Sequence, residues 1–291
     1  MTPGRILRLL GRFFLEGFQP IAPAPHHPDP AGWSDAAITG AWLGHSTVLV
    51  NFFGVWMIVD PVLAARCGLR FGPVTIGPRR RVRPALSVKE LPEIDLLLLT
   101  HAHMDHLDLW TIRRLRGRPH AVVAAGLRDL MEGLPLSGVT ELAWDESAEI
   151  STPHGSVRVT ARRVAHWGAR MRTDDWRGYC GLVAERNGRR IGFAGDTART
   201  DFSHWAQGGP IDLLAVPIGA YNPWVQSHCN PEEAVAMAGE AGARLLLPVH
   251  HQTFQLSAEP MDEPIARFRA ALRETPERIA AAEIGATFRV D

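Results

Sequence analysis

The feature that most constrains this chain is a cluster of metal-ligand side chains placed where a buried strand ends. Residues 94–100 (IDLLLLT) form a short continuous apolar run, which is typical of a strand buried on both faces. The run leads directly into His101, His103, Asp105 and His106. Residues two apart on an extended backbone point the same way, so the first two histidines converge on one point, and after a turn the next pair can face a second. Such a cluster needs partners or metal to offset its desolvation, so the pattern indicates a metal site.

Three more candidate ligands follow predicted strands elsewhere in the chain. His166 follows the strand predicted at residues 157–164, Asp196 follows IGFAG, and His250 follows LLLPV. One metal ion needs three or more protein ligands and a pair needs a bridge, so these residues are candidates to complete the site. Taken singly, each has a structural alternative, either as a solvated loop histidine or, for Asp196, as a turn cap. As a set, they predict a site at one edge of a sheet sandwich.

Strand patterns recur along the chain and indicate two sheets sandwiched between helices. Residues 41–53 and 55–59 predict a hairpin with Gly54 in its turn, and a long loop at residues 63–92 follows. A helix is predicted at residues 231–241, with Asn230 as its cap. The other predicted strands are residues 121–124, 157–163, 179–185, 190–194, 213–216 and 245–249, and the other predicted helices are residues 111–115 and 127–132.

Composition excludes some classes of protein. Basic and acidic residues both number 31, so no global field indicates nucleic acid or an anionic membrane as the main partner. The three cysteines, Cys67, Cys180 and Cys229, show no CxxC spacing, which argues against a disulfide framework or a thiolate zinc site and fits a reducing compartment. A count of 13 histidines is high and fits imidazole metal chemistry.

Residues 1–18 carry an amphipathic, basic pattern. Arg5, Arg8, Arg12 and Glu16 interrupt the apolar run that a signal peptide needs, and no stretch reaches the roughly 18 apolar residues of a membrane span. A helix lying on a membrane surface and a helix docked on the protein's own body are both open alternatives. We therefore expect a cytoplasmic protein, with peripheral membrane contact through residues 1–18 as one alternative.

The ordered motifs resemble the metallo-β-lactamase superfamily and, within it, the N-acyl-phosphatidylethanolamine phospholipase D family. The matching segments are WLGHSTVLV (42–50), VDPVL (59–63), GPRRRVRP (77–84), ELPEIDLLLLTHAHMDHLD (90–108), AHW (165–167), GDT (195–197), PIGAYNP (217–223), HCNPEEAV (228–235) and VHHQTF (249–254). The resemblance implies an α/β fold, the αββα sandwich of two mixed β-sheets flanked by helices, for residues 31–291. Residues 1–30 form a separate amphipathic, Pro-rich segment in this reading.

The resemblance also implies a ligand set and a cofactor, two zinc ions. One metal is expected on His101, His103 and His166 and the other on Asp105, His106 and His250, with Asp196 as the bridge. His251 is the second choice to His250.

The expected chemistry is hydrolytic. Two zinc ions about 3.5 to 4 Å apart share a water and lower its pKa towards 7, which makes hydroxide the expected nucleophile. Asp105 and Asp196 are the expected catalytic carboxylates. Asp60 and Asp108 are candidate acceptors for spare imidazole nitrogens, and a plain strand-end turn residue is the alternative for Asp60. The diiron redox members of the superfamily resemble HxExD at this point, with glutamate at the position of His103. A histidine here favours zinc hydrolysis over redox chemistry.

Further residues are candidates for contacting the substrate, and each has a structural alternative. His45 is expected to line or buttress the site, and His228 to lie on its wall. Aromatic side chains can form an apolar rim for acyl chains, although core packing is the usual role of such residues; they are Tyr221, Trp224 and Trp167. The arginines at residues 79–81 and 83 can attract a phosphate head group, with a solvated basic loop as the alternative.

The leading functional hypothesis is hydrolysis of a phosphodiester in a glycerophospholipid such as an N-acyl-phosphatidylethanolamine, releasing phosphatidic acid. The alternative is a lactonase or other ester hydrolase of the same fold. Neutral net charge and the lack of a basic or aromatic stacking stripe disfavour a nuclease, so no nucleic-acid partner is expected. All seven ligand positions are present, which disfavours a non-catalytic metal-stabilised scaffold. The expected partner is a small-molecule or lipid substrate, and a homodimer is an open alternative to a monomer.

Overall fold

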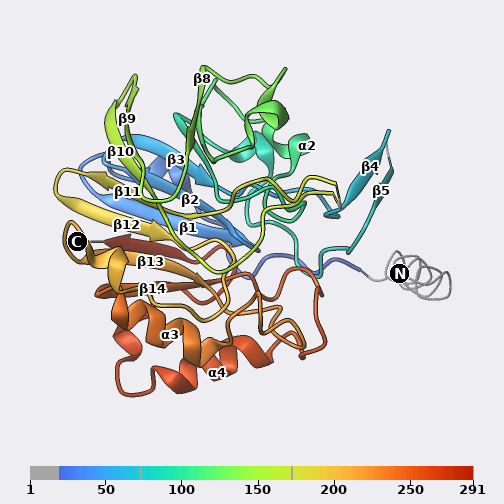
Figure 1. The fold of residues 1–291 in the computed structure, drawn as a ribbon, viewed down its shortest axis with the longest axis vertical. Coiled ribbons are helices and arrows are strands. Elements are labelled where there is room, and N and C mark those ends of the chain that lie inside the picture. The colour runs from blue at the N-terminus through green and yellow to red at the C-terminus, as the bar shows by residue number, and fades with distance from the viewer. Residues whose placement is uncertain (1–19, 73, 172, 291) are drawn as a thin grey trace.

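Two β-sheets pack face to face in the computed structural model, which describes residues 20–72, 74–171 and 173–290 (Figure 1). The strands of the first sheet, in spatial order, are β15 (Thr287–Val290), β1 (Ile38–Gly44), β2 (Thr47–Phe52), β3 (Val55–Val59), β6 (Leu96–Leu99), β7 (His120–Ala124) and β8 (Gly138–Leu142). Those of the second are β14 (Ala243–Val249), β13 (Ile211–Pro217), β12 (Arg189–Phe193), β11 (Gly181–Arg186), β10 (Gly155–Arg162) and β9 (Ser147–Thr152).

Helices cover the sandwich from outside. Helices α3 (Pro231–Glu240) and α4 (Glu263–Ala271) lie on the second sheet, and the short α2 (Leu109–Ile112) lies on the other side of the molecule (Figure 1). Single 3-10 turns occupy Pro30–Gly32, Val88–Glu90, Arg128–Met131, Ser203–Ala206 and Pro276–Arg278. A two-stranded hairpin, β4 (Leu69–Phe71) and β5 (Val74–Ile76), stands apart from both sheets. The predicted αββα sandwich of mixed sheets is confirmed.

The core lies between the two sheets because their inner faces are apolar. All four leucines of β6 are fully buried, as the continuous apolar run predicts. Strand β10 instead alternates, with Val157, Val159 and Ala161 buried in the core between the sheets. A second apolar cluster fills the space between the second sheet and its helices, where Met237 of α3 and Phe268 of α4 are fully buried.

Helix α3 begins where its capping residues predict. The Asn230 side chain accepts from the Glu233 backbone N–H at 2.9 Å, and the Glu233 carboxylate accepts from the Asn230 N–H at 3.0 Å. Pro231 occupies the first helical position, where its missing N–H costs nothing.

Several predicted elements differ from the observed ones. The strand predicted at residues 41–53 divides into β1 and β2, because His45 takes a left-handed backbone conformation with φ of 52° and reverses the chain. The next turn is as predicted, with Gly54 at φ of 88° between β2 and β3. The helix predicted at residues 111–115 is the short α2, and that at residues 127–132 is only a 3-10 turn. The elements that the pattern missed are β4, β5, β8, β9, β15 and α4.

Strand direction brings distant parts of the chain to one edge. Strands β1 and β3 both pair antiparallel with β2, and β3 is parallel to β6, so these three run the same way. In the second sheet the same reasoning makes β10, β12 and β14 co-directional. In each sheet, the carboxyl ends of these three strands therefore lie along one edge.

Within the described residues, none of the helices combines the length and hydropathy that crossing a bilayer requires. The predicted surface helix at residues 1–18 lies outside the described residues. Residues 22 and 26 pair with the body through the Ala22–Val82 bridge and the bond from the His26 N–H to the Ile284 carbonyl.

Gly40 tests the packing of the first sheet. A Cβ at Gly40 would overlap the Phe288 ring of β15 and lie 2.8 Å from the Leu49 carbonyl oxygen. We expect Gly40→Ala to lower the free energy of unfolding by about 1–3 kcal/mol, measured by urea denaturation. The matched control is Gly239→Ala in α3, where nothing lies within 4 Å and alanine is the better helix former; it should raise stability by up to about 1 kcal/mol. Equal stability of the two variants would contradict the described packing.

Candidate metal centre

The predicted ligands meet because each follows a strand whose carboxyl end lies at the same edge. In the first sheet, His45 follows β1, Asp60 follows β3 and His101 follows β6. In the second sheet, Asp196 follows β12 and His250 follows β14. His166 follows β10, and His103, Asp105 and His106 lie on the loop after β6. Strand direction within each sheet, together with the packing of the two sheets, thus brings these residues together.

One group of donors is formed by three histidines and a carboxylate. The Nδ1 atom of His103 lies 2.9 Å from Nε2 of His101 and 3.2 Å from Nε2 of His166. The Oδ2 atom of Asp196 lies 3.8 Å from Nε2 of His101 and 3.7 Å from Nε2 of His166. All four ligand atoms lie within 4.8 Å of one another, so they can share one ion.

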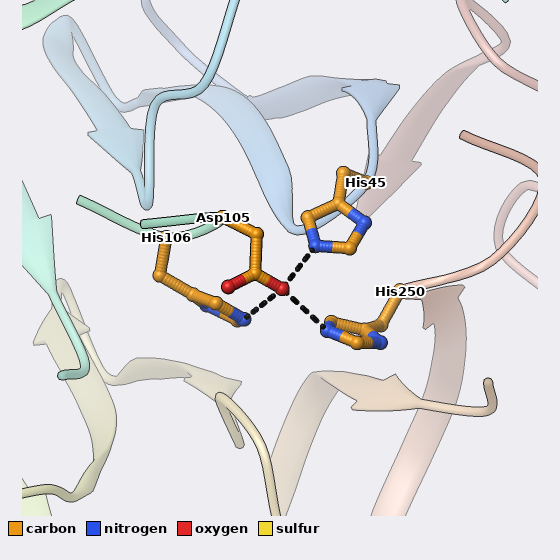
Figure 2. Close-up of side chains that lie close together, drawn as sticks. All are labelled: His45, Asp105, His106 and His250. Atoms are coloured by element: carbon orange, nitrogen blue, oxygen red, sulfur yellow. Dashed lines mark hydrogen bonds and ion pairs between the residues drawn. The ribbon is translucent and has the colours of Figure 1, made fainter. Parts of the chain in front are cut away.

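A second group surrounds Asp105. Figure 2 shows its Oδ2 atom facing three imidazoles, at 3.0 Å from His45 Nε2, 3.4 Å from His250 Nε2 and 4.0 Å from His106 Nε2. The structure thus adds His45 to the predicted set of Asp105, His106 and His250.

Asp196 joins the two groups. Its Oδ2 atom lies 3.2 Å from His106 Nε2 and 3.3 Å from His250 Nε2, besides its distances to the first group. His228 Nδ1 is 3.9 Å from the same oxygen, so His228, predicted as a substrate contact, also belongs to the cluster. This position between two donor sets is the one expected of a bridging carboxylate.

Hydrogen bonds at the back of the imidazoles decide which nitrogen faces the centre. The Thr100 hydroxyl donates to Asp60 at 2.6 Å, so it accepts from His101 Nδ1 at 3.0 Å and leaves Nε2 with a free lone pair. His106 Nδ1 donates to the same oxygen of Asp60, Oδ2, at 2.8 Å. His166 Nδ1 donates to the Ser227 carbonyl at 3.0 Å. In each of these three histidines Nδ1 is thus occupied and Nε2 faces the centre, as in metal ligands.

The centre contains buried polar atoms that have no hydrogen-bond partner in the described part of the chain. They are His45 Nδ1, His106 Nε2, His228 Nδ1, both ring nitrogens of His250 and both carboxylate oxygens of Asp196. Leaving such groups unpaired costs free energy. A cation placed among them would satisfy the inward-facing ones, so the residues fit a metal ion.

The electrostatics of the cluster agree with this arrangement. Burial opposes ionisation of Asp196, yet the facing His106 and His250 hold the pKa of this carboxyl well below its usual range. Burial likewise opposes protonation of His250, but Asp196 raises the pKa of its imidazole to about 9. Burial lowers the pKa of His166 to about 3, which keeps its ring neutral. An ionised Asp196 thus faces a His250 imidazole that favours protonation, whereas the His166 ring stays neutral.

Backbone strain is concentrated at the same edge. Three non-glycine residues of the site take left-handed conformations, with φ of 52° at His45, 41° at Asp60 and 64° at His250. Such conformations cost about 1–3 kcal/mol each and persist only where the surroundings impose them. The His250 N–H bond to the His45 carbonyl, at 3.0 Å, links two of these residues.

Of the three aromatic side chains predicted to contact the substrate, two are exposed and one is buried. The Trp167 ring lies 4.8 Å from the His103 ring and 4.4 Å from the His166 ring, between centroids, and is 45% exposed. Trp224 is also exposed, and its carbonyl accepts from the His228 N–H. Tyr221 is a correction: it is buried, and its hydroxyl donates to Glu263 of α4 at 2.6 Å.

Three further sequence hypotheses are decided by contacts. Asp60 is the predicted imidazole acceptor, whereas Asp108 caps α2 by accepting from the Trp110 N–H. His251 stacks on Trp42 with centroids 4.5 Å apart and joins none of the donor groups found among the described residues. Arg80 does not face a phosphate site, because its buried guanidinium donates to backbone carbonyls of residues 62, 64 and 82.

Two supporting residues were missed from the sequence. Thr100 bonds to Asp60 and His101 through its hydroxyl group. Its place directly before His101 in the sequence was the signal that could have identified it. Arg170 donates through Nη1 to the carbonyls of Ala102 and Leu107, at 2.8 and 2.9 Å, and so holds the ligand loop. No sequence pattern points to Arg170.

Comparison with known proteins identifies the family of this chain. The sequence profile of the family described as "Beta-lactamase superfamily domain" matches residues 55–251. N-acyl-phosphatidylethanolamine-hydrolyzing phospholipase D 1 of Caenorhabditis elegans is 33% identical over 253 residues, covering 79% of this chain and 69% of that protein.

Solved structures share the fold. An isothiocyanate hydrolase from Delia radicum gut bacteria superposes with a TM-score of 0.66 at 18% identity, covering 86% of this chain and 99% of that one. The diiron β-hydroxylase CmlA from Streptomyces venezuelae gives a TM-score of 0.58 at 21% identity, covering 82% of this chain and 52% of that one. With the profile match over most of its length, the chain belongs to the β-lactamase superfamily and is a metal-dependent hydrolase of the metallo-β-lactamase fold.

Proposed function

We propose that this protein is a binuclear zinc hydrolase that cleaves phosphodiesters, acting in the manner of a phospholipase D on N-acyl-phosphatidylethanolamine-like glycerophospholipids. The observation that carries the proposal is the Asp196 carboxylate, which lies between two separate sets of imidazole donors. A single ion would leave one of these sets without a partner. The similarity to the nematode phospholipase D supports the substrate class.

The donor set supports zinc. Imidazole nitrogens and carboxylate oxygens, with no cysteine or methionine sulfur in either donor group, suit zinc among other first-row metals. We assign His101, His103 and His166 to one ion, and Asp105, His106 and His250 to the other, with Asp196 shared. When bound, the two ions would supply Lewis acidity, making a water molecule acidic near neutral pH and offsetting charge on the phosphoryl oxygens.

The protein's own groups would then orient the attacking water molecule and accept its proton. The Asp105 side chain is 17% exposed whereas that of Asp196 is 1% exposed, so Asp105 is the carboxylate that substrate and solvent can reach. His45 and His250 hold its Oδ2 atom from two sides (Figure 2). Asp105 is therefore placed to orient the attacking water and accept its proton. The exposed Trp167 ring beside His103 offers apolar surface for an acyl chain.

Adjacent histidines test the ligand assignment. We expect His250→Ala to lower the zinc content from about two ions to about one per chain, because one set loses a donor. His251→Leu is the matched control, since His251 packs on Trp42 and should retain both ions. Metal analysis of the folded, dialysed proteins measures this. Loss of zinc in His251→Leu and not in His250→Ala would instead make His251 the ligand and His250 the packing residue.

Asp60 tests the outer hydrogen bonds. Asp60→Asn replaces the acceptor of His106 Nδ1 and of the Thr100 hydroxyl, so we expect zinc affinity to fall about 10–100-fold. Asp108→Asn makes the same chemical change at a residue that only caps α2, and it should bind zinc as the wild type does. Competition with a chelator gives both affinities, and equal affinities would remove Asp60 from the ligand network.

Substrate preference tests the reaction. We expect the zinc-loaded enzyme to hydrolyse bis-p-nitrophenyl phosphate, and His101→Ala to lose at least about a hundredfold in kcat/KM. A panel of N-acyl-phosphatidylethanolamines should yield phosphatidic acid, detected by mass spectrometry. Turnover of lactones with none of any phosphodiester would favour the alternative ester hydrolase. No turnover of either class by fully metallated enzyme would reject the proposal.

A further inference from the structure

The β4–β5 hairpin presents four large apolar side chains on one face. Leu69 pairs with Ile76 and Phe71 with Val74 in its antiparallel register. Because side chains alternate across a strand, these two pairs share a face, and the intervening pair of Arg70 and Thr75 lies on the other.

This apolar face is open to solvent. The exposed fractions are 40% for Leu69, 60% for Phe71, 57% for Val74 and 41% for Ile76. The hairpin pairs with no other strand in the described parts of the chain, and Figure 1 shows it as a narrow ribbon that projects from the body. A contiguous apolar patch on a projecting element is a mark of an interaction surface.

The hairpin is anchored at its base beside the metal centre. The Cys67 N–H donates to the Pro78 carbonyl at 3.2 Å, and Arg66 Nη1 donates to the Gly77 carbonyl at 2.7 Å. Cys67 packs in a small apolar cluster with Phe254, whose ring lies 5.0 Å from the ring of His45 between centroids. A surface that engaged the hairpin would therefore lie close to the edge that carries the ligands.

Basic side chains flank the hairpin. Between Asp60 and Glu90 the chain contains seven basic residues and no acidic one. Exposed Arg70 and Arg114 both lie over the Trp110 ring, at 5.4 and 4.3 Å from its centroid. Exposed Lys89 and Arg116 line the adjoining cleft, which Trp110 also borders. An apolar ridge thus stands beside a positive patch in a chain of zero net charge.

We propose that the β4–β5 hairpin is a membrane-docking element. Its apolar face enters the interface of a bilayer that contains anionic lipid, and the neighbouring arginines and Lys89 contact the head groups. A second copy of this chain would bring positive charge against positive charge, whereas an anionic lipid surface is complementary in both hydrophobicity and charge. Docking does not depend on the proposed catalytic function, because it uses none of the metal-centre residues.

Vesicle co-sedimentation of the full-length protein tests the proposal. The probes are phosphatidylcholine vesicles with and without phosphatidylserine. We expect binding to the anionic vesicles and a loss of about tenfold or more in affinity for the double variant Phe71→Ser/Val74→Ser, since two apolar side chains no longer enter the bilayer. The matched control Thr75→Ser, on the opposite face, should bind as the wild type does. Arg114→Gln/Arg116→Gln should weaken the preference for phosphatidylserine.

Two further readouts separate this proposal from its rivals. All variants should hydrolyse soluble bis-p-nitrophenyl phosphate at the wild-type rate, so failure of docking is distinguishable from failure of catalysis. The proposal would be overturned if the wild-type protein did not bind anionic vesicles. It would also be overturned if the double variant bound them with the affinity of the wild type. A wild-type dimer that becomes a monomer in the double variant, measured by sedimentation velocity, would instead assign the face to a second copy.

Discussion

A buried carboxylate surrounded by imidazoles controls the organisation of this protein. Both oxygens of Asp196 are buried and accept no hydrogen bond from the described residues, while nitrogens from His101, His106, His166 and His250 lie 3.2 to 3.8 Å from Oδ2. Burial of an unsatisfied carboxylate is costly, and a cation is the partner that offsets this cost. The fold therefore has a charged site at its edge whose inward-facing polar groups a metal ion would satisfy.

Asp60 connects the two halves of this site. One of its oxygens accepts from the Thr100 backbone N–H and the other from the Thr100 hydroxyl and His106 Nδ1. Through Thr100 it also fixes His101, which belongs to the other donor group. A single strand-end carboxylate thus orients imidazoles for both proposed ions, and it does so from a left-handed backbone conformation.

The candidate metal centre is accessible to solvent from one side in the described residues. Asp105 and Trp167 are the accessible groups, whereas Asp196 and Asp60 are closed off in the interior. The projecting β4–β5 hairpin is rooted through Cys67 and Phe254 beside His45 at the same edge. The candidate metal centre and the proposed docking surface therefore lie at one end of the sandwich. Helices α3 and α4 pack on the second sheet from behind.

The sequence alone determined the parts that depend on local pattern. The apolar run of β6, the ligand spacing that follows it and the cap of α3 could be read directly, because strand periodicity and capping act over a few residues. The candidate ligands at residues 166, 196 and 250 could be proposed since each follows a strand. Only the tertiary structure decided the roles of side chains whose partners are distant. It assigned Tyr221 to Glu263, turned Arg80 towards backbone carbonyls and brought His45 and His228 into the cluster. It also left the apolar face of the hairpin uncovered, because what packs against a side chain depends on strand order and direction and not on its neighbours in sequence.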